Sequence, residues 1–203
     1  MRSVSIILII VSTIILSSCA SGYKYMQPEK IVYSNKLTED GLQFSYFYNV
    51  LSETDNDDYS KKEIKSPIKV LAVKIKNETG RKLDIGEDVL FLKNGQPVET
   101  VSPKQVESQI KQGTLGYLFY LLLTPMNLTI SREDNTDTYP IGLAVGPGIA
   151  FGNMIYASSA NSTFKKNLTT ENILTRQVGD GETVYGLLCI LGSSMDPITI
   201  KLK

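Results

Sequence analysis

Short segments in which apolar and polar residues alternate recur along most of this chain. In the first of them, every second position carries an apolar or aromatic side chain: Leu42, Phe44, Tyr46 and Tyr48. Alternation with period two places such side chains on one face of a β-strand and leaves the other face polar. Turn-forming residues separate the segments, and Asn94-Gly95 between two apolar pieces is typical of a tight hairpin. The pattern therefore favours half-buried strands.

The same alternation continues in residues 67–76, 82–101 and 182–202. About six or seven strand segments joined by turns fit a β-sandwich better than a barrel or a βαβ sheet. The chain is therefore predicted to be mainly β. The expected core contains Leu71, Val73, Ile75, Phe91, Leu188 and Ile190.

Two apolar helices are predicted to interrupt the strands. Ser102-Pro103-Lys104-Gln105 combines an N-cap residue, a proline at the first helical position and a glutamine at the third, as in a capping box. The first helix is expected over about 102–124 and the second over about 147–166, which begins at Pro147. Both lie in a predicted helical insertion, residues 102–168.

Residues 141–160 contain no charged side chain and are rich in glycine. Ala144, Gly148 and Gly152 recur every four positions, so on a helix they form a smooth face that lets another backbone approach closely. We expect this face to pack on residues 115–123. An alternative is that residues 115–160 enter a membrane as a hairpin, although about 20 Å of helix over 114–126 is short of the roughly 30 Å hydrocarbon core.

The first twenty residues combine a positive start with an apolar run that ends at a cysteine. Arg2 precedes the apolar residues 4–16, which are too few to span roughly 30 Å of hydrocarbon comfortably. Leu16-Ser17-Ser18-Cys19 follows and resembles the lipobox of bacterial lipoprotein precursors. The resemblance implies a signal peptide over residues 1–18 and a mature chain that begins at lipidated Cys19. We expect a lipid-anchored tether over 19–40.

Acyl chains such as palmitate on Cys19 would anchor the chain, because each buried methylene contributes about 0.8 kcal/mol and two chains hold stably. Ala20 follows the cysteine, and by resemblance to sorting in bacteria with two membranes this implies the outer membrane. The strand end Asn77-Glu78-Thr79-Gly80 and the later Gly181-Glu182 resemble those of uncharacterised immunoglobulin-like domains in bacterial envelope lipoproteins. That resemblance implies an immunoglobulin-like β-sandwich over 41–203 and carries no activity with it.

The chain contains no histidine, the commonest general base and metal ligand. No Ser-x-x-Lys lies in an apolar, pocket-forming context, and no phosphate-binding glycine motif is present, so we expect no enzyme and no catalytic, cofactor or metal site. Asp55, Asp57 and Asp58 lack the glycine and the distant glutamate of a calcium loop, which indicates a solvated loop over 52–66. With 21 basic and 21 acidic residues, the charge predicts no nucleic-acid partner.

Two further residue types require an interpretation. If Cys19 carries lipid, Cys189 has no disulfide partner, and its apolar surroundings indicate a small core residue rather than a reactive thiol. Asn-x-Ser/Thr triplets begin at Asn77, Asn127, Asn161 and Asn167. In a chain with a lipobox we interpret them as coincidences and not as glycan acceptors.

The sequence thus predicts a lipoprotein anchored in the bacterial cell envelope that acts as a non-catalytic binding or assembly module. Its expected partners are the lipid bilayer, reached through the acyl chains on Cys19, and a protein of the envelope. The alternative is a structural component of an envelope assembly, with a membrane-inserted glycine-rich hairpin over 115–160. The oligomeric state, the partner and the orientation stay open.

Overall fold

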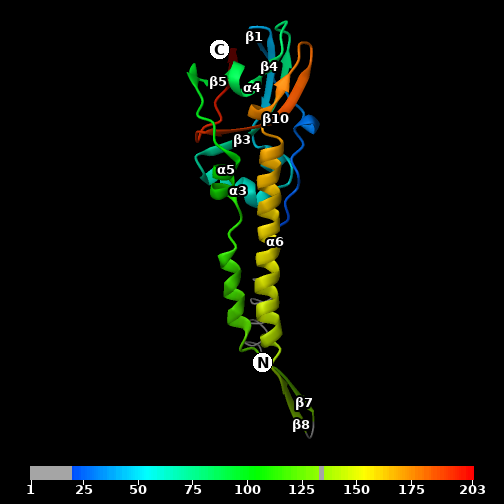
Figure 1. Ribbon diagram of the computed structural model, residues 1–203. Coiled ribbons are helices and arrows are strands. Elements are labelled where there is room, and N and C mark those ends of the chain that lie inside the picture. Colours follow the sequence, from blue (N-terminus) through cyan, green and yellow to red (C-terminus); the bar gives the residue numbers. More distant parts are fainter. Residues whose placement is uncertain (1–19, 133–134) are drawn as a thin grey trace. The chain divides into compact units, whose positions relative to one another are not determined.

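The computed structural model describes residues 20–132 and 135–203 (Figure 1). The predicted signal peptide and Cys19 lie outside these residues. The chain divides into two compact units, of which unit 1 is Met1–Gly22 with Gly113–Ala160 and unit 2 is Tyr23–Gln112 with Asn161–Lys203. The segment that separates from the remainder is therefore 113–160, where the sequence predicts an insertion over 102–168.

Helices and strands are mixed in this fold, with 38% of residues helical and 30% in strands. A mainly β fold is therefore too simple a description. All ladders between the named strands are antiparallel, as expected for sheets built from hairpins and returning strands.

The largest sheet of unit 2 has the strand order β1-β2-β3-β10. Its strands are β1 (Leu37–Glu39), β2 (Leu42–Phe47), β3 (Ile68–Asn77) and β10 (Thr183–Leu191). Ile68 to Lys76 of β3 pair with Leu191 to Thr183 of β10. The edge strand β10, from the last part of the chain, thus lies beside the central strand β3.

A second sheet has the order β11-β5-β6 and consists of Ile198–Leu202, Val89–Lys93 and Gln96–Pro97. A short ladder joins β4 (Leu83–Asp84) to β9 (Gln177–Val178). Both sheets contribute to one apolar cluster, in which the Phe44 and Phe91 ring centroids are 5.9 Å apart. All six predicted core residues are buried in this cluster, which confirms that part of the prediction: Leu71, Val73, Ile75, Phe91, Leu188 and Ile190.

Helices cover the other face of the large sheet. Val70 and Ala72 of β3 pack in a second cluster with residues of α2 (Val50–Glu53), α3 (Asp57–Lys65), α5 (Pro103–Ile110) and the end of α6 (Gly142–Thr170). Unit 2 thus has a helical layer and two sheet layers. The loop expected over 52–66 is wrong, because α3 turns buried Tyr59 toward this cluster and leaves Asp57, Lys61 and Lys65 exposed.

The first predicted helix is divided. The capping box is confirmed. The backbone N–H of Gln105 donates to Ser102 Oγ at 3.4 Å, and the backbone N–H of Ser102 donates to Gln105 Oε1 at 3.2 Å. The α-helix nevertheless ends at Ile110, and Leu115–Leu123 forms a separate 3₁₀-helix, η2, in unit 1. Extended backbone at Lys111 and the bonds of Gln112 to Asn161 interrupt the helix between the two.

The second predicted helix is longer than 147–166. α6 begins at Gly142 and contains Pro147 in its second turn, where the proline cannot donate an intrahelical hydrogen bond and its ring crowds the carbonyl group four residues earlier. β7 (Leu128–Arg132) and β8 (Asn135–Tyr139) precede it as a hairpin. The short helices α4 (Ile85–Asp88), η1 (Pro28–Lys30) and η3 (Ile173–Thr175) complete the described elements.

Residues 23–40, predicted as part of a tether, pack into unit 2. Met26 is fully buried, and the side chains of Tyr23, Ile31 and Tyr33 lie against the same helix-covered cluster. The sequence does not predict this packing, because the aromatic and apolar residues of the segment follow no steady period. The segment fills gaps between other elements and does not form a long element itself.

Candidate functional site

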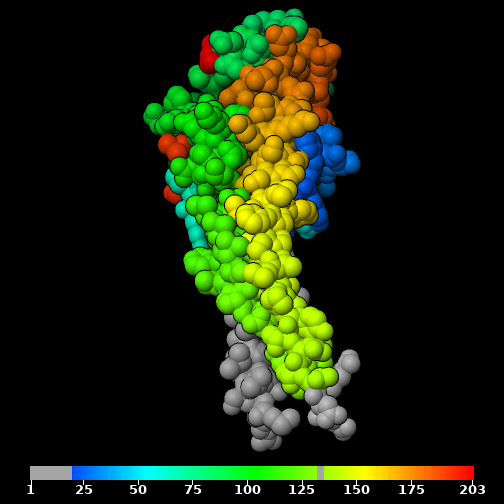
Figure 2. Space-filling view, turned by 60° about the horizontal axis from the view of Figure 1, so that its bottom comes forward, coloured from blue at the N-terminus to red at the C-terminus, as the bar shows by residue number. Residues whose placement is uncertain are grey.

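Unit 1 has an uncharged surface with many exposed apolar side chains. η2 and residues 142–160 of α6 run side by side there, as Figures 1 and 2 show, and we call these two segments the apolar hairpin. Between residues 113 and 160, charged side chains occur only at Arg132, Glu133, Asp134 and Asp137, within or between β7 and β8. The apolar hairpin itself carries no charge.

Two glycines bring the halves of the apolar hairpin together. A β-carbon added at Gly142 would overlap the carbonyl oxygens of Leu123 and Thr124, and one at Gly146 would lie 3.0 Å from the Tyr120 carbonyl oxygen. Only residues without side chains permit so close an approach between backbones. The Gly142 amide nitrogen also donates to the Met126 carbonyl oxygen at 2.9 Å, which closes the hairpin.

The contact predicted for Ala144, Gly148 and Gly152 is therefore made by a different set of small residues. A β-carbon at Gly148 or Gly152 meets no described atom within 4 Å, and Ala144 is exposed. The buried stripe of α6 in unit 1 consists of Gly142, Gly146, Ala150, Ala157 and Ala160. Gly142, Gly146 and Ala150 recur every four positions, as Ala144, Gly148 and Gly152 do, so the spacing alone could not select between faces offset by two residues.

Large apolar side chains cover the outward faces of the apolar hairpin. With about three residues per turn in a 3₁₀-helix, Tyr117, Tyr120 and Leu123 align toward α6 and the other two columns face outward. The most exposed large apolar residues in the two segments, by fraction of side chain and backbone accessible, are Leu115 and Phe119 at 74%, Leu122 at 73%, Ile155 at 71%, Leu143 at 63%, Tyr156 at 54% and Phe151 at 52%. These exposed apolar side chains make the apolar hairpin the candidate interaction surface of the described chain.

The start of the described chain lies on the apolar hairpin. The Ala20 amide nitrogen donates to Asn153 Oδ1 at 3.1 Å, and a β-carbon added at Gly22 would lie 2.8 Å from the Tyr156 hydroxyl oxygen. Residues 20–22 accordingly belong to unit 1 and not to unit 2. The residue that follows predicted lipid-bearing Cys19 is thus bound to α6.

The other residues singled out in the sequence have structural roles. Burial raises the pKa of the Cys189 thiol to about 12, so it stays protonated and unreactive at neutral pH. Asp55 pairs with Lys24 at 2.6 Å, and Asp57 and Asp58 occupy the first turn of α3, where the helix dipole favours them. Over residues 20–132 and 135–203, no three His, Cys, Asp or Glu side chains gather as metal ligands would.

A buried pair of charged residues fastens α3 to β3. Lys69 Nζ donates to the Glu63 carbonyl oxygen at 2.7 Å, and Glu63 Oε1 accepts from the Val70 amide nitrogen at 2.7 Å. Burial raises the pKa of Glu63 to about 7, although the Val70 hydrogen bond and the charge of Lys69 act in the opposite direction. Because the contacts of both side chains fasten neighbouring elements, we interpret the pair as structural.

Three of the four Asn-x-Ser/Thr asparagines are buried: Asn77, Asn161 and Asn167. Asn167 Oδ1 accepts from the Met26 amide nitrogen at 2.8 Å, and its Nδ2 donates to the Met26 carbonyl oxygen at 3.1 Å. Asn161 forms the same two bonds with Gln112, at 2.8 and 3.0 Å. These side chains pair with backbone as a strand neighbour would, a role that no sequence motif signals.

No protein-family description, curated protein or solved structure matches the chain. Among the helices that the structure describes, none combines the length and the hydropathy required to cross a bilayer. The apolar hairpin is therefore characterised by its own chemistry: it is uncharged, exposed and bonded to the residue after Cys19.

Proposed function

We propose that this chain is a lipid-anchored, non-catalytic module of the bacterial envelope, and that its apolar hairpin lies in the interface of the same bilayer that holds Cys19. The observation that carries the proposal is the Ala20–Asn153 hydrogen bond, which joins the predicted lipid attachment point to an uncharged surface rich in exposed leucine and phenylalanine. The residue after Cys19 favours the outer membrane of a host with two membranes.

The dimensions of the apolar hairpin support an interfacial position. η2 rises about 2 Å per residue and is only about 18 Å long, against roughly 30 Å of hydrocarbon. An interfacial helix needs to bury its apolar side only about 5–10 Å into the bilayer. The apolar hairpin would add to the membrane affinity that the acyl chains on Cys19 provide and would hold unit 1 against the bilayer surface.

A fatty-acid label tests the anchor. Metabolic labelling should mark the wild-type protein and the control variant Cys189→Ala equally, because Cys189 is buried in the core. The variant Cys19→Ala should lose the label completely. Equal labelling of Cys19→Ala and wild type would refute lipid attachment at this residue.

Vesicle flotation tests the apolar hairpin independently of the anchor. The mature chain, residues 19–203 with Cys19→Ser, lacks the apolar signal peptide and should float with neutral phosphatidylcholine vesicles. Adding Phe119→Ser and Leu122→Ser should weaken partitioning by roughly 100-fold or more, since each large apolar side chain contributes about 1.5–3 kcal/mol when fully buried. Ile64→Ser is the matched control, because Ile64 is 68% exposed but lies in unit 2.

If the variant with Phe119→Ser and Leu122→Ser floats as well as the Ile64→Ser control, the bilayer proposal is contradicted. The second candidate is then assembly with an envelope protein, which the exposed Ala144, Gly148 and Gly152 favour, because small residues let a partner helix approach closely. Gly148→Leu should block such a partner and leave flotation unchanged. The immunoglobulin-like character of unit 2 also stays a proposal, supported by the two sheets that share one core.

A further inference from the structure

The helix-covered face of the large sheet changes character along β3. Val70 and Ala72 lie under the helices, whereas the next residues on the same face, Lys74 and Lys76, lie beyond the apolar cluster. The strand register extends these positions into rows, with Ser45 and Tyr185 opposite Lys74 and with Gln43 and Thr183 opposite Lys76. One sheet face is thus apolar and covered at one end but polar and open at the other.

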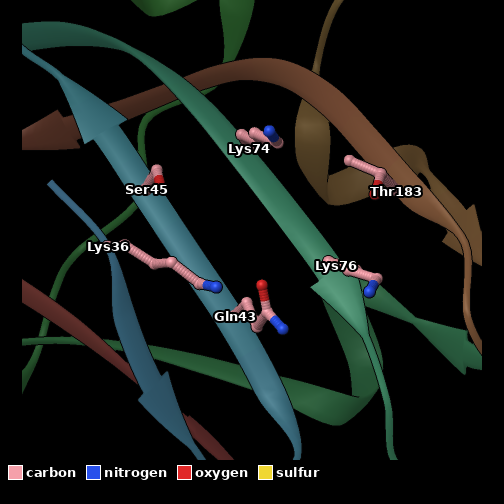
Figure 3. Close-up of a pocket in the computed structure, with 6 residues that line it drawn as sticks. All are labelled: Lys36, Gln43, Ser45, Lys74, Lys76 and Thr183. Carbon is pink, nitrogen blue, oxygen red and sulfur yellow. The ribbon is translucent and has the colours of Figure 1, made fainter. Parts of the chain in front are cut away.

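A cavity of about 140 Å³ occupies the open end, and we call it the lysine groove. It is lined by Lys36, Gln43, Ser45, Lys74, Lys76 and Thr183. Figure 3 shows these side chains on one side of the sheet, with Lys36 extending across β2 toward Gln43. Every lining side chain has a hydrogen-bond donor, and the volume accommodates a group much larger than one water molecule.

Positive charge in the lysine groove is only partly neutralised. Glu78 accepts from Lys76 Nζ at 2.6 Å and from Gln43 Nε2 at 2.7 Å. These bonds, together with the charge of Lys36, lower the pKa of Glu78. Within the part of the chain that the structure describes, neither Lys36 nor Lys74 has a salt bridge to a carboxylate. Lys74 instead lies over the Tyr185 ring, with Nζ 5.6 Å from the centroid.

We propose that the lysine groove binds an oxyanion, a phosphate or carboxylate group, between Lys36, Lys74 and Lys76. Hydroxyl donors come from Ser45 and Thr183, and a tetrahedral or planar oxyanion can accept from several donors at once. Glu78 is the internal anion of the groove and competes with the ligand for Lys76 and Gln43. The site lies in unit 2 and uses no residue of the apolar hairpin, so it is independent of the membrane proposal.

Titration with soluble anions tests the site. The full chain with Cys19→Ser is titrated with inorganic phosphate, pyrophosphate and acetate while amide NMR shifts of residues 36, 43–45 and 74–76 are followed. We expect saturable shifts there, tightest for pyrophosphate because of its higher charge. Lys36→Gln and Lys74→Gln should each weaken binding about fivefold or more, and Glu78→Gln should strengthen it.

Lys165→Gln is the matched control, since Lys165 is an exposed lysine of unit 2 outside the groove. The proposal is overturned if Lys74→Gln binds pyrophosphate as tightly as Lys165→Gln does, or if shifts are non-saturable and equal around all exposed lysines. Unchanged melting temperatures would show that the substitutions leave the fold intact.

Vesicles distinguish the source of the oxyanion. With Phe119→Ser and Leu122→Ser present to remove hairpin partitioning, binding to phosphatidylglycerol vesicles that depends on Lys74 identifies a lipid headgroup as ligand. Saturable phosphate binding without such vesicle binding identifies a soluble or glycan-borne anion. Loss of flotation on neutral phosphatidylcholine concerns the apolar hairpin alone and leaves this result unaffected.

Discussion

Units 1 and 2 use apolar side chains in opposite ways. In unit 2, β3 is buried on both faces, by the second sheet on one side and by helices on the other. In unit 1, the apolar hairpin buries small residues between its halves and presents leucine and phenylalanine outward. The comparison indicates that unit 2 contains the larger apolar core of the chain, whereas unit 1 carries an exposed apolar surface that we propose lies against the bilayer.

Substitutions in the sheet core should have the largest effect. Leu71→Ala and Phe91→Ala each remove a side chain from the core that the two sheets share. Each substitution should lower the free energy of unfolding by about 2–5 kcal/mol. Denaturant unfolding followed by circular dichroism measures the change. Unchanged stability in both variants would show that these strands do not face a common core.

Buried asparagines extend the comparison to polar groups. Asn167→Ala leaves the Met26 N–H and C=O without partners and should cost about 2–4 kcal/mol, because each buried unsatisfied group costs about 1–3 kcal/mol. Asn127→Ala is the matched control in unit 1, where Asn127 is exposed, and should change stability by less than about 0.5 kcal/mol. Equal effects in the two variants would contradict the pairing role of Asn167.

The raised pKa of Glu63 predicts that the stability of unit 2 depends on pH. Its folded-state pKa of about 7 lies above the ordinary 4.5, so the folded state binds the proton more tightly than the unfolded state. The resulting stabilisation is complete below about pH 4.5 and is lost as the pH rises through 7. Glu63→Gln should therefore raise stability above pH 8, by at most about 3 kcal/mol.

The difference between wild type and Glu63→Gln isolates this group from the exposed Glu78, Asp88 and Asp196, whose pKa values are lowered. Thermal melts from pH 4 to 9 measure the difference. A constant difference over this range would mean that Glu63 does not titrate there.

The strands and the core could be predicted because period-two alternation directly reports which face is buried. Leu71, Val73 and Ile75 are predicted from that pattern and confirmed. The same pattern predicts only one buried face for β3, because the lysines at 74 and 76 obscure the fact that Val70 and Ala72 are covered farther along the strand. Alternation within a strand cannot indicate where a covering layer ends.

The helices and the contacts between distant segments were harder to predict. α3 is rich in acidic and basic residues and has a single buried face, which contains Tyr59 and Glu63. Its composition therefore resembles that of a polar loop. In α6 the small-residue spacing is correct but the face is not, since choosing between Gly146 and Gly148 requires the position of η2. Neither the Ala20–Asn153 bond nor the lysine groove has a local signal, because each joins distant segments.

Glycine substitutions test the interior of unit 1. Gly146→Leu should force η2 away from α6 and cost about 1–3 kcal/mol, because a side chain there meets the Tyr120 and Thr124 backbone. Gly152→Leu should be tolerated, since a β-carbon at that position meets no described atom within 4 Å. Limited proteolysis between Tyr139 and Lys166 measures the difference. Faster cleavage of Gly152→Leu than of Gly146→Leu would reverse the assignment of the two faces.

The smallest expected effect is the most direct comparison of the two units, because it uses the same substitution in each. Phe119 is 74% exposed, whereas Phe91 is 4% exposed. Phe119→Ala should therefore change the free energy of unfolding by less than about 0.5 kcal/mol, although Phe91→Ala costs several. The same variant should raise the solubility of the unlipidated chain, since it removes apolar surface. If Phe119→Ala instead destabilises the protein as strongly as Phe91→Ala does, the side chain packs within the free molecule. The apolar hairpin would then be core and not contact surface.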